Sequence, residues 1–317
     1  MRSQLAWAWS RFDTVQYAEE IIARLDPVNL NYTIRSDDQL HQLNRLGLEP
    51  ESLDIRAGVS LEALDSYASR HRLALLMLSN DAATDLDFLV GHTELRSLVI
   101  TACPALVDVT ALSGLAIRHL DITTARSDMD LHPLSQLRNL ETLRVSGPSG
   151  LEWSPQTLPV QAPLNSLSVS GEARPARGLK GLGDFTQLTS LTLNRPSSPA
   201  STDDWEQIRD LSHLTDLSTT AASFETLPAT AFLSSVSSLS LIGGGGERVV
   251  QAAVNRLAKA FPGLMFCEFT GDMTAEGDVD LAPLAGLPHL RGLSLAIDRD
   301  RVRGIDTLPS WVDLHLL

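Results

Sequence analysis

A ladder of apolar residues recurs along most of the chain. In residues 131–145 leucine or valine stands at successive spacings of 3, 3, 3, 3 and 2, and similar ladders occupy 179–193 and 281–295. The closing L-x-x-L-x-L cores begin 21 to 28 residues apart, which gives about 13 repeats with a mean step near 24. Self-similarity at this period is typical of a solenoid, in which each repeat packs only on its neighbours.

Two periods inside each repeat predict its local structure. The closing L-x-L alternates, so it predicts a short strand with both leucines on one face. The preceding residues repeat every three, which is the period of a 3-10 turn or of one short helical segment. Neither segment can bury its apolar side alone. We therefore expect stacked repeats whose strands form one parallel sheet over a continuous leucine core.

The repeats at 130–145 (DLHPLSQLRNLETLRV) and 280–295 (DLAPLAGLPHLRGLSL) resemble the leucine-rich repeat family, in its short 22-residue class of internalin and phosphatase-regulator types. The resemblance covers roughly residues 27–317. It implies an α/β solenoid, a leucine-rich repeat horseshoe or arc with a parallel concave sheet and short helices or 3-10 turns on the convex side. The family places Asn or Cys three residues after the last strand leucine, and Cys103 fits that position. Other repeats depart from it, so we expect less regular turns than in a consensus array.

The domain organisation follows from the same repeat. Residues 27–317 are predicted to form the solenoid, which grows by adding layers and so needs no second core. Residues 1–26 are predicted to form an N-terminal amphipathic helix that either caps the stack or links it to a domain missing from the chain. Ser36 and Ser60 are predicted helix N-caps within the early repeats. Apolar residues at helical spacing predict a further helix over 247–261.

Charge and composition exclude several functional classes. The chain carries 39 acidic and 25 basic residues, a net charge of −14, which argues against binding nucleic acid or an anionic membrane through a basic surface. It has no run of about 18 apolar residues that would predict a membrane-spanning helix. It also has no clear signal peptide, and its two cysteines form no CxxC pair. We predict a cytoplasmic protein.

No catalytic or cofactor-binding motif emerges from the sequence. HExxH and GxSxG do not occur. His92 occupies a leucine position of a ladder, which favours a partly buried core histidine over a ligand. Cys267 likewise replaces a core leucine and is predicted to be a small apolar filler. We predict that the protein is not an enzyme and has no cofactor, catalytic residue or metal site.

The exposed positions of the L-x-x-L-x-L cores are the better place to seek function, because they face the concave side of the sheet. They place a mixed-charge cluster on three successive repeats, composed of Arg96, Arg118, His119, Asp121, Glu141 and Arg144. A long Ser/Thr surface over 165–240 adjoins it, and Ser and Thr are also simply tolerated on an open sheet face. Trp153 lies in an irregular loop, where it is either an exposed anchor for a partner or a cover that folds back on the stack.

These observations predict a protein–protein recognition module. The architecture is similar to the C-terminal sensor arm of bacterial NACHT/STAND-type signalling NTPases, which act in defence against phage. That similarity implies a ligand-sensing or scaffolding arm that recognises a foreign protein. The alternative is a stand-alone regulatory subunit that binds and modulates an enzyme. The last repeat ends without a polar capping segment, and an open strand edge favours association. The sequence leaves open the oligomeric state and whether a second copy, a partner or nothing covers the C-terminal end.

Overall fold

The computed structural model describes residues 2–25, 30–194, 200–243, 251–270 and 278–316. The described residues contain a parallel sheet of 13 strands with helices or 3-10 turns between them. The chain divides into two compact bodies. We call residues 1–152 and 157–163 the N-terminal body, and residues 153–156 and 164–317 the C-terminal body.

The strands of the N-terminal body pair with their neighbours in chain order. They are β1 (Asn31–Ile34), β2 (Ser52–Arg56), β3 (Leu75–Ser79), β4 (Ser97–Ile100), β5 (His119–Thr123) and β6 (Thr142–Gly147). The register aligns one buried leucine from each of five strands in a single row, composed of Leu53, Leu76, Leu98, Leu120 and Leu143. This row confirms the predicted strand and its buried face.

The C-terminal body repeats this arrangement. Its sheet strands are β8 (Ser166–Gly171), β10 (Ser190–Asn194), β11 (Asp216–Thr220), β12 (Ser238–Ile242), β13 (Phe266–Thr270), β15 (Gly292–Leu295) and β17 (Asp313–Leu316). Cys267 stands in register between Leu239 and Leu293 and is buried, as predicted for a core filler. Two short pairs lie outside the sheet: β7 (Glu152–Trp153) with β9 (Arg174–Leu179), and β14 (Val279–Asp280) with β16 (Val302–Arg303).

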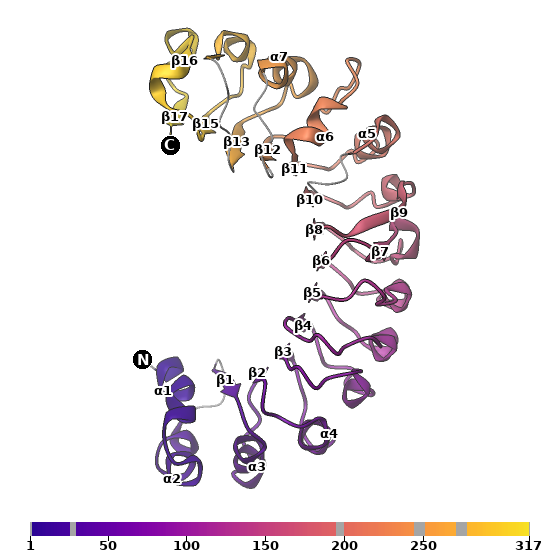
Figure 1. The fold of residues 1–317 in the computed structure, drawn as a ribbon, viewed down its shortest axis with the longest axis vertical. Coiled ribbons are helices and arrows are strands. Elements are labelled where there is room, and N and C mark those ends of the chain that lie inside the picture. The colour runs from indigo at the N-terminus through magenta and orange to yellow at the C-terminus, as the bar shows by residue number, and fades with distance from the viewer. Residues whose placement is uncertain (1, 26–29, 195–199, 244–250, 271–277, 317) are drawn as a thin grey trace. The chain divides into compact units, whose positions relative to one another are not determined.

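Within each body the strands lie along the inner side and the return segments along the outer side (Figure 1). In the N-terminal body the returns are α3 (Asp37–Arg45), α4 (Leu61–Ala68), η3 (Asp87–Leu89), η4 (Thr110–Gly114) and η5 (His132–Gln136). In the C-terminal body they include α5 (Thr202–Arg209), α6 (Ala221–Glu225), α7 (Gln251–Ala260), η7 (Leu182–Asp184), η8 (Ala282–Gly286), η9 (Arg299–Arg301) and η10 (Ile305–Thr307). The short turn η6 (Pro155–Thr157) has residues in both ranges. The predicted α/β solenoid is confirmed.

Helix starts follow the predicted capping residues. Ser36 Oγ accepts a hydrogen bond from the Gln39 amide at 3.4 Å, and Ser60 Oγ accepts one from the Ala63 amide at 3.1 Å. Each bond satisfies an amide that the first helical turn leaves unpaired. The helix predicted over 247–261 is described from residue 251, where α7 begins, and residues 247–250 lie outside the described part of the chain.

Four 3-10 turns share a cap that is local to their own repeat. In each, an aspartate Oδ1 accepts a hydrogen bond from the first amide of the turn, two residues further on. The distances are 3.2, 2.8, 2.8 and 2.9 Å for Asp85, Asp108, Asp130 and Asp280. This local bond satisfies the first amide of each turn.

Cys103 makes a contact of the other kind, which joins two repeats. Its Sγ accepts a hydrogen bond from the Asn80 amide at 3.3 Å, and the Asn80 side chain donates to the Val59 carbonyl at 2.7 Å. The Asn80 carbonyl Oδ1 also accepts from the amides of Ala82 and Ala83. These bonds satisfy buried backbone groups across neighbouring turns.

The N-terminal segment is not the single helix that its periodicity predicts. It is divided into α1 (Arg2–Ala8), η1 (Trp9–Arg11), α2 (Thr14–Glu20) and η2 (Ile22–Arg24). The break occurs because Phe12 is extended and Asp13 starts a new helix by accepting from the Gln16 amide at 2.8 Å. Trp9 is fully buried, whereas Phe12 is 59% exposed. Helix α1 contacts β1 and α2 contacts α3, and a capping role for this segment stays a prediction.

Candidate functional site

The predicted charged cluster does come together on the inner face of the N-terminal body. Asp121 on β5 stands directly opposite Arg144 on β6, with Arg144 Nη1 3.6 Å from Asp121 Oδ2. Arg118, just before β5, lies 3.1 Å from Glu141 through Nη1 and Oε1. The cluster therefore consists mainly of cross-strand ion pairs, and a partner would have to compete with these internal contacts.

The other two members of the cluster, Arg96 and His119, take no part in these two ion pairs. Arg96 is exposed, and its Nη1 donates to the Thr93 carbonyl at 2.7 Å, while His119 is exposed at the start of β5.

Burial raises the pKa of the Asp121 carboxyl, and the neighbouring Arg144 guanidinium opposes that rise. The ion pairs of this cluster lie across an open face of the sheet.

A more buried polar chain, which sequence reasoning missed, crosses β1 to β4 on the same face. Asp54 is only 4% exposed, and its Oδ2 accepts from Arg56 Nη2 at 2.8 Å and from Thr33 Oγ1 at 3.2 Å. Ser79 continues the chain by contacting Arg56 at 3.4 Å and Thr101 at 2.7 Å. A buried carboxylate needs such partners, so these residues are accounted for by the fold.

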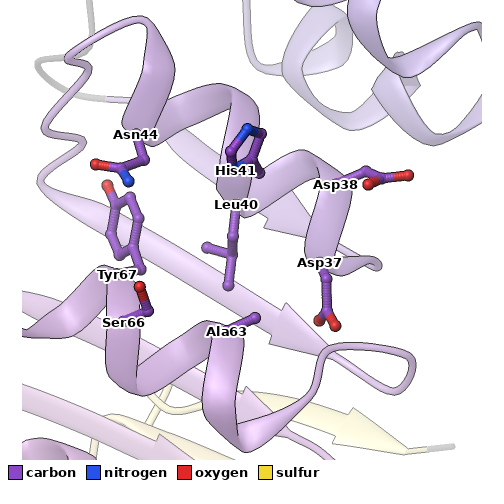
Figure 2. Close-up of a pocket in the computed structure, with 8 residues that line it drawn as sticks. All are labelled: Asp37, Asp38, Leu40, His41, Asn44, Ala63, Ser66 and Tyr67. Atoms are coloured by element: carbon purple, nitrogen blue, oxygen red, sulfur yellow. The ribbon is translucent and has the colours of Figure 1, made fainter.

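A hollow of about 270 Å³ lies between the outer helices α3 and α4 (Figure 2). Its polar groups tie the two helices and their loops together: Asp37 accepts from the Ser60 amide at 2.7 Å, and the Tyr67 hydroxyl donates to the Leu48 carbonyl at 3.2 Å. Burial raises the pKa of the Tyr67 phenol. The hollow is therefore held by contacts that build the helix pair. It is lined by Asp37, Asp38, Leu40, His41, Asn44, Ala63, Ser66 and Tyr67.

The inner face of the C-terminal body differs in chemistry. From β8 to β12 the residues that face inward are mainly hydroxyl side chains, half-buried among their neighbours; they include Ser166, Ser168, Ser190, Thr192, Ser218, Ser238 and Ser240. This is the Ser/Thr surface that the exposed core positions predict. A pocket begins on this face at β12.

This hollow, which we call the concave pocket, has a volume of about 480 Å³. It is lined by Ser238, Leu239, Ser240, Phe266, Cys267, Glu268, Arg291, Gly292, Leu293, Ser294, Asp313 and His315. The register places inward-facing residues in two rows across four strands, because alternate residues of a strand share a face. One row is Ser238, Phe266, Gly292 and Asp313, and the other is Ser240, Glu268, Ser294 and His315.

Phe266 supplies an aromatic surface at this pocket. Its side chain is 52% exposed although it belongs to a sheet strand. A Cβ added to Gly292 would lie 3.1 Å from Phe266 Cδ1 and 3.5 Å from Cε1. The ring thus occupies space that the missing Gly292 side chain leaves open. A large apolar side chain exposed beside polar groups is characteristic of an interaction site.

The charged groups of the concave pocket are less fully paired than those of the N-terminal body. Among the described residues, Glu268 makes no ion pair. Asp313 Oδ2 lies 3.1 Å from His315 Nε2. The Arg291 guanidinium lies 5.8 Å from the centre of the Trp311 ring, and its Nη1 donates to the Leu290 carbonyl at 3.2 Å. The pocket therefore offers two carboxylates against one guanidinium.

The thiol at the base of the pocket is not suited to nucleophilic chemistry. Cys267 is buried between leucines, and burial, together with nearby Glu268, raises the pKa of its thiol. A thiol with a raised pKa remains protonated at neutral pH, and the thiolate is the reactive form. The pocket can instead bind a chemical group through contact with the Phe266 ring and through the charge of its carboxylates.

The sequence did contain the signal for this pocket. The exposed positions of the last three L-x-x-L-x-L cores hold Phe266 with Glu268, Gly292 with Ser294, and Asp313 with His315. An aromatic residue at an exposed strand position, followed by a glycine in the next repeat, is the pattern to seek. Clustered charge lies instead at the exposed positions of earlier repeats.

Trp153 is not the exposed loop anchor that its position suggested. Its side chain is only 5% exposed. The reason is local: residues 152–153 form strand β7, which pairs with β9 and draws the loop onto the body. The alternative, a side chain that folds back as a cover, agrees with this burial.

Comparison with known proteins supports the fold assignment. No family model matches the chain, and no curated protein matches it. Among solved structures, an internalin from Listeria monocytogenes covers 99% of this chain and 93% of its own, with 15% identity and a TM-score of 0.50. Internalin C2 from the same organism covers 64% and 83%, with 21% identity and a TM-score of 0.43. A leucine-rich repeat protein of Leptospira interrogans covers 90% and 82%, with 15% identity and a TM-score of 0.46.

The first of these likenesses, together with the stacked leucine rows, shows that the chain has the leucine-rich repeat fold. In the part of the chain that the structure describes, no helix has both the length and the apolar character needed to cross a membrane.

Proposed function

We propose that this chain is a recognition module that binds a protein partner through the inner face of its C-terminal body. The observation that carries the proposal is the concave pocket, where a half-exposed Phe266 stands beside carboxylates on an otherwise hydroxyl-rich sheet. Hot spots of protein interfaces combine such an aromatic anchor with a polar surround. The chain is proposed to act without catalysis, in the cytoplasm, and on protein and not on nucleic acid.

The charged cluster of the N-terminal body has a lesser part in this proposal. Its guanidinium groups at Arg118 and Arg144 already have carboxylate partners on the neighbouring repeat. Exposed ion pairs of this kind contribute little affinity but help to select a partner of matching charge. We therefore assign the cluster to orientation and the concave pocket to affinity.

Site-specific photocrosslinking tests the proposal. A benzophenone side chain is introduced at Ser240, inside the pocket, or at Asp203, which is exposed on α5. Proteins captured from the native host only through position 240 are identified, produced in pure form and titrated against the chain. We expect direct binding that Phe266→Ala weakens at least about tenfold. A chain that binds no protein at this face, yet turns over a small substrate, would contradict the proposal.

The wider role that we propose is the ligand-sensing or scaffolding arm of a bacterial defence or signalling protein of the NACHT/STAND type. Its support is the recognition surface together with the stacked-repeat architecture. A neighbouring or fused reading frame that encodes a nucleotide-binding Walker A motif is the expected genomic context.

The second candidate function is that of a regulatory subunit. It predicts instead that the partner is an enzyme whose activity changes on binding. Light scattering would measure the oligomeric state, including association through the C-terminal end.

A further inference from the structure

We propose that the concave pocket binds a basic side chain, a lysine or an arginine, that the partner protein presents. This inference rests on the proposed function and names the chemical group that the pocket recognises. Three features carry it: the placement of the carboxylates, the low floor between them, and the aromatic ring at their side.

The carboxylates stand on the two strands that flank β15 and lie diagonally across it, Glu268 in the row of Ser294 and Asp313 in the row of Gly292. Glu268 belongs to β13 and Asp313 to β17, with β15 between them. Two inter-strand steps of the sheet separate these strands by roughly 10 Å. In the row of Glu268, the intervening strand contributes Ser294, whose small side chain leaves the space above β15 open, whereas in the other row the Phe266 ring lies beside Gly292. A long, narrow basic side chain fits this trough better than a bulky apolar one.

The ring of Phe266 adds an interaction that favours a cation. It forms part of the pocket wall beside Gly292, and its ring is half exposed. An aromatic face attracts an ammonium or guanidinium group through its negative quadrupole. The same kind of contact already exists nearby, where the Arg291 guanidinium lies over the Trp311 ring.

The remaining groups in the pocket include His315, whose Nε2 lies 3.1 Å from Asp313 Oδ2, and two serines that suit this occupant. The hydroxyls of Ser240 and Ser294 can accept hydrogen bonds from an ammonium or guanidinium. Arg291 has its own contacts with Trp311 and with the Leu290 carbonyl. A basic partner is also favoured at long range by the net charge of −14.

Glu268 is the carboxylate that most distinguishes this pocket from the charged cluster of the N-terminal body. Among the described residues it has no cationic partner, whereas Asp121 and Glu141 face Arg144 and Arg118. An incoming cation would thus gain a charge contact at Glu268 without displacing an internal one. The inference therefore assigns the basic side chain to the C-terminal body.

Displayed peptides test the assignment and do not require the partner protein itself. Three libraries share random flanks and differ only in a fixed central residue, which is basic (Lys or Arg), Glu or Leu. We expect the purified full chain to retain the basic library at least about tenfold above the other two, the change that a contact of about 1.4 kcal/mol produces. A chain carrying Glu268→Gln and Asp313→Asn is expected to lose this preference to within about twofold.

The matched control changes the net charge equally but outside the pocket. Asp300→Asn with Asp306→Asn neutralises two exposed carboxylates in η9 and η10 of the same body and should leave the preference intact. Thermal unfolding of both double variants shows that they remain folded.

Equal retention of the three libraries, a preference for Glu or Leu, or a preference that survives the pocket variant would each overturn the assignment. So would equal loss in both double variants, which would indicate bulk charge. The photocrosslinking at Ser240 is independent of these selections. A protein captured there, without any basic preference, would overturn the inference and leave the proposed function standing.

Discussion

The two bodies bury the same kind of leucine row but use their inner faces differently. In the N-terminal body, Leu120 and Leu143 lie beneath a surface where Asp121 and Arg144 pair across strands. In the C-terminal body, Cys267 and Leu293 lie beneath a surface with an exposed Phe266. The first face satisfies its own charges, and the second leaves an aromatic ring and a carboxylate accessible.

This difference shows how a repeat separates stability from recognition. The leucines at the buried positions specify the stack, and the positions between them are free to vary without altering it. A pocket arises where the side chains at those positions alternate between large and small from one strand to the next. Phe266 and Asp313 flank Gly292 in one row, whereas the rows around Arg144 contain side chains of more even size.

The largest expected effect tests the feature that both bodies share. Leu143→Asp and Leu293→Asp each place an unpaired carboxylate in a position that is 1% exposed. We expect each to lower the free energy of unfolding by about 4 kcal/mol or more. Arg144→Ala, one residue from Leu143 but exposed, should change it by less than about 0.5 kcal/mol. Urea unfolding measures all three, and similar losses for Leu143→Asp and Arg144→Ala would refute the assigned register.

The second effect separates the two faces. Phe266→Ala should weaken binding of the crosslinked partner by about 2 kcal/mol, as expected for an interface anchor. Because the side chain is 52% exposed, we expect the free energy of unfolding to fall by less than about 1 kcal/mol. Val99→Ala removes an apolar side chain at an inward-facing position of β4 and should weaken binding less than about twofold. Titration by calorimetry compares them, and equal weakening would remove the distinction between the bodies.

The shape of the pocket gives an intermediate effect. Gly292→Ala brings a methyl group within 3.1 Å of Phe266 Cδ1, so the ring must move. We expect partner binding to fall by about threefold to fivefold, less than on removing the ring. Gly286→Ala is the control, because a Cβ there meets nothing within 4 Å. Unchanged binding by Gly292→Ala would show that the ring position is unimportant.

The smallest effect concerns the ion pair of the N-terminal body. Burial raises the pKa of Asp121 in the folded state, so the ionised group opposes folding, and stability from this residue is lost as pH rises through that pKa. Asp121→Asn should therefore be more stable than the parent at pH 7, by less than about 0.5 kcal/mol after screening by solvent. The difference should vanish near pH 3. Urea unfolding at both pH values measures it, and a variant less stable at pH 7 would mean that the Arg144 contact outweighs burial.

Sequence reasoning predicted the repeating elements better than it predicted the irregular ones. The leucine spacing determines which side chains of β4 to β6 are buried, because only one alternation matches the stack. The N-terminal segment differs, since its periodicity continues through Phe12 while Asp13 caps a new helix there. Trp153 was unpredictable for a similar reason, because the pairing of β7 with β9 belongs to an insertion that the repeat does not describe.

The candidate site was only partly predictable. Placement of Asp121 and Arg144 on one face follows from the spacing, but their mutual pairing depends on which residues are opposite in the register. The concave pocket follows the same spacing rule at Phe266 and Gly292. Its depth depends on the ring of Phe266 lying over Gly292, which is a rotamer choice made in three dimensions.

The aspartate caps of the 3-10 turns bear on how such a chain can change in length. Asp85, Asp108 and Asp130 are 23 and 22 residues apart, and each binds an amide of its own repeat. A gene duplication or deletion of that many codons would therefore carry a complete turn with it. The bond between Cys103 and Asn80 spans two repeats, so an in-frame deletion between them would leave a buried amide without its acceptor. Changes in repeat number should thus be tolerated more readily between Asp108 and Asp130 than between Asn80 and Cys103.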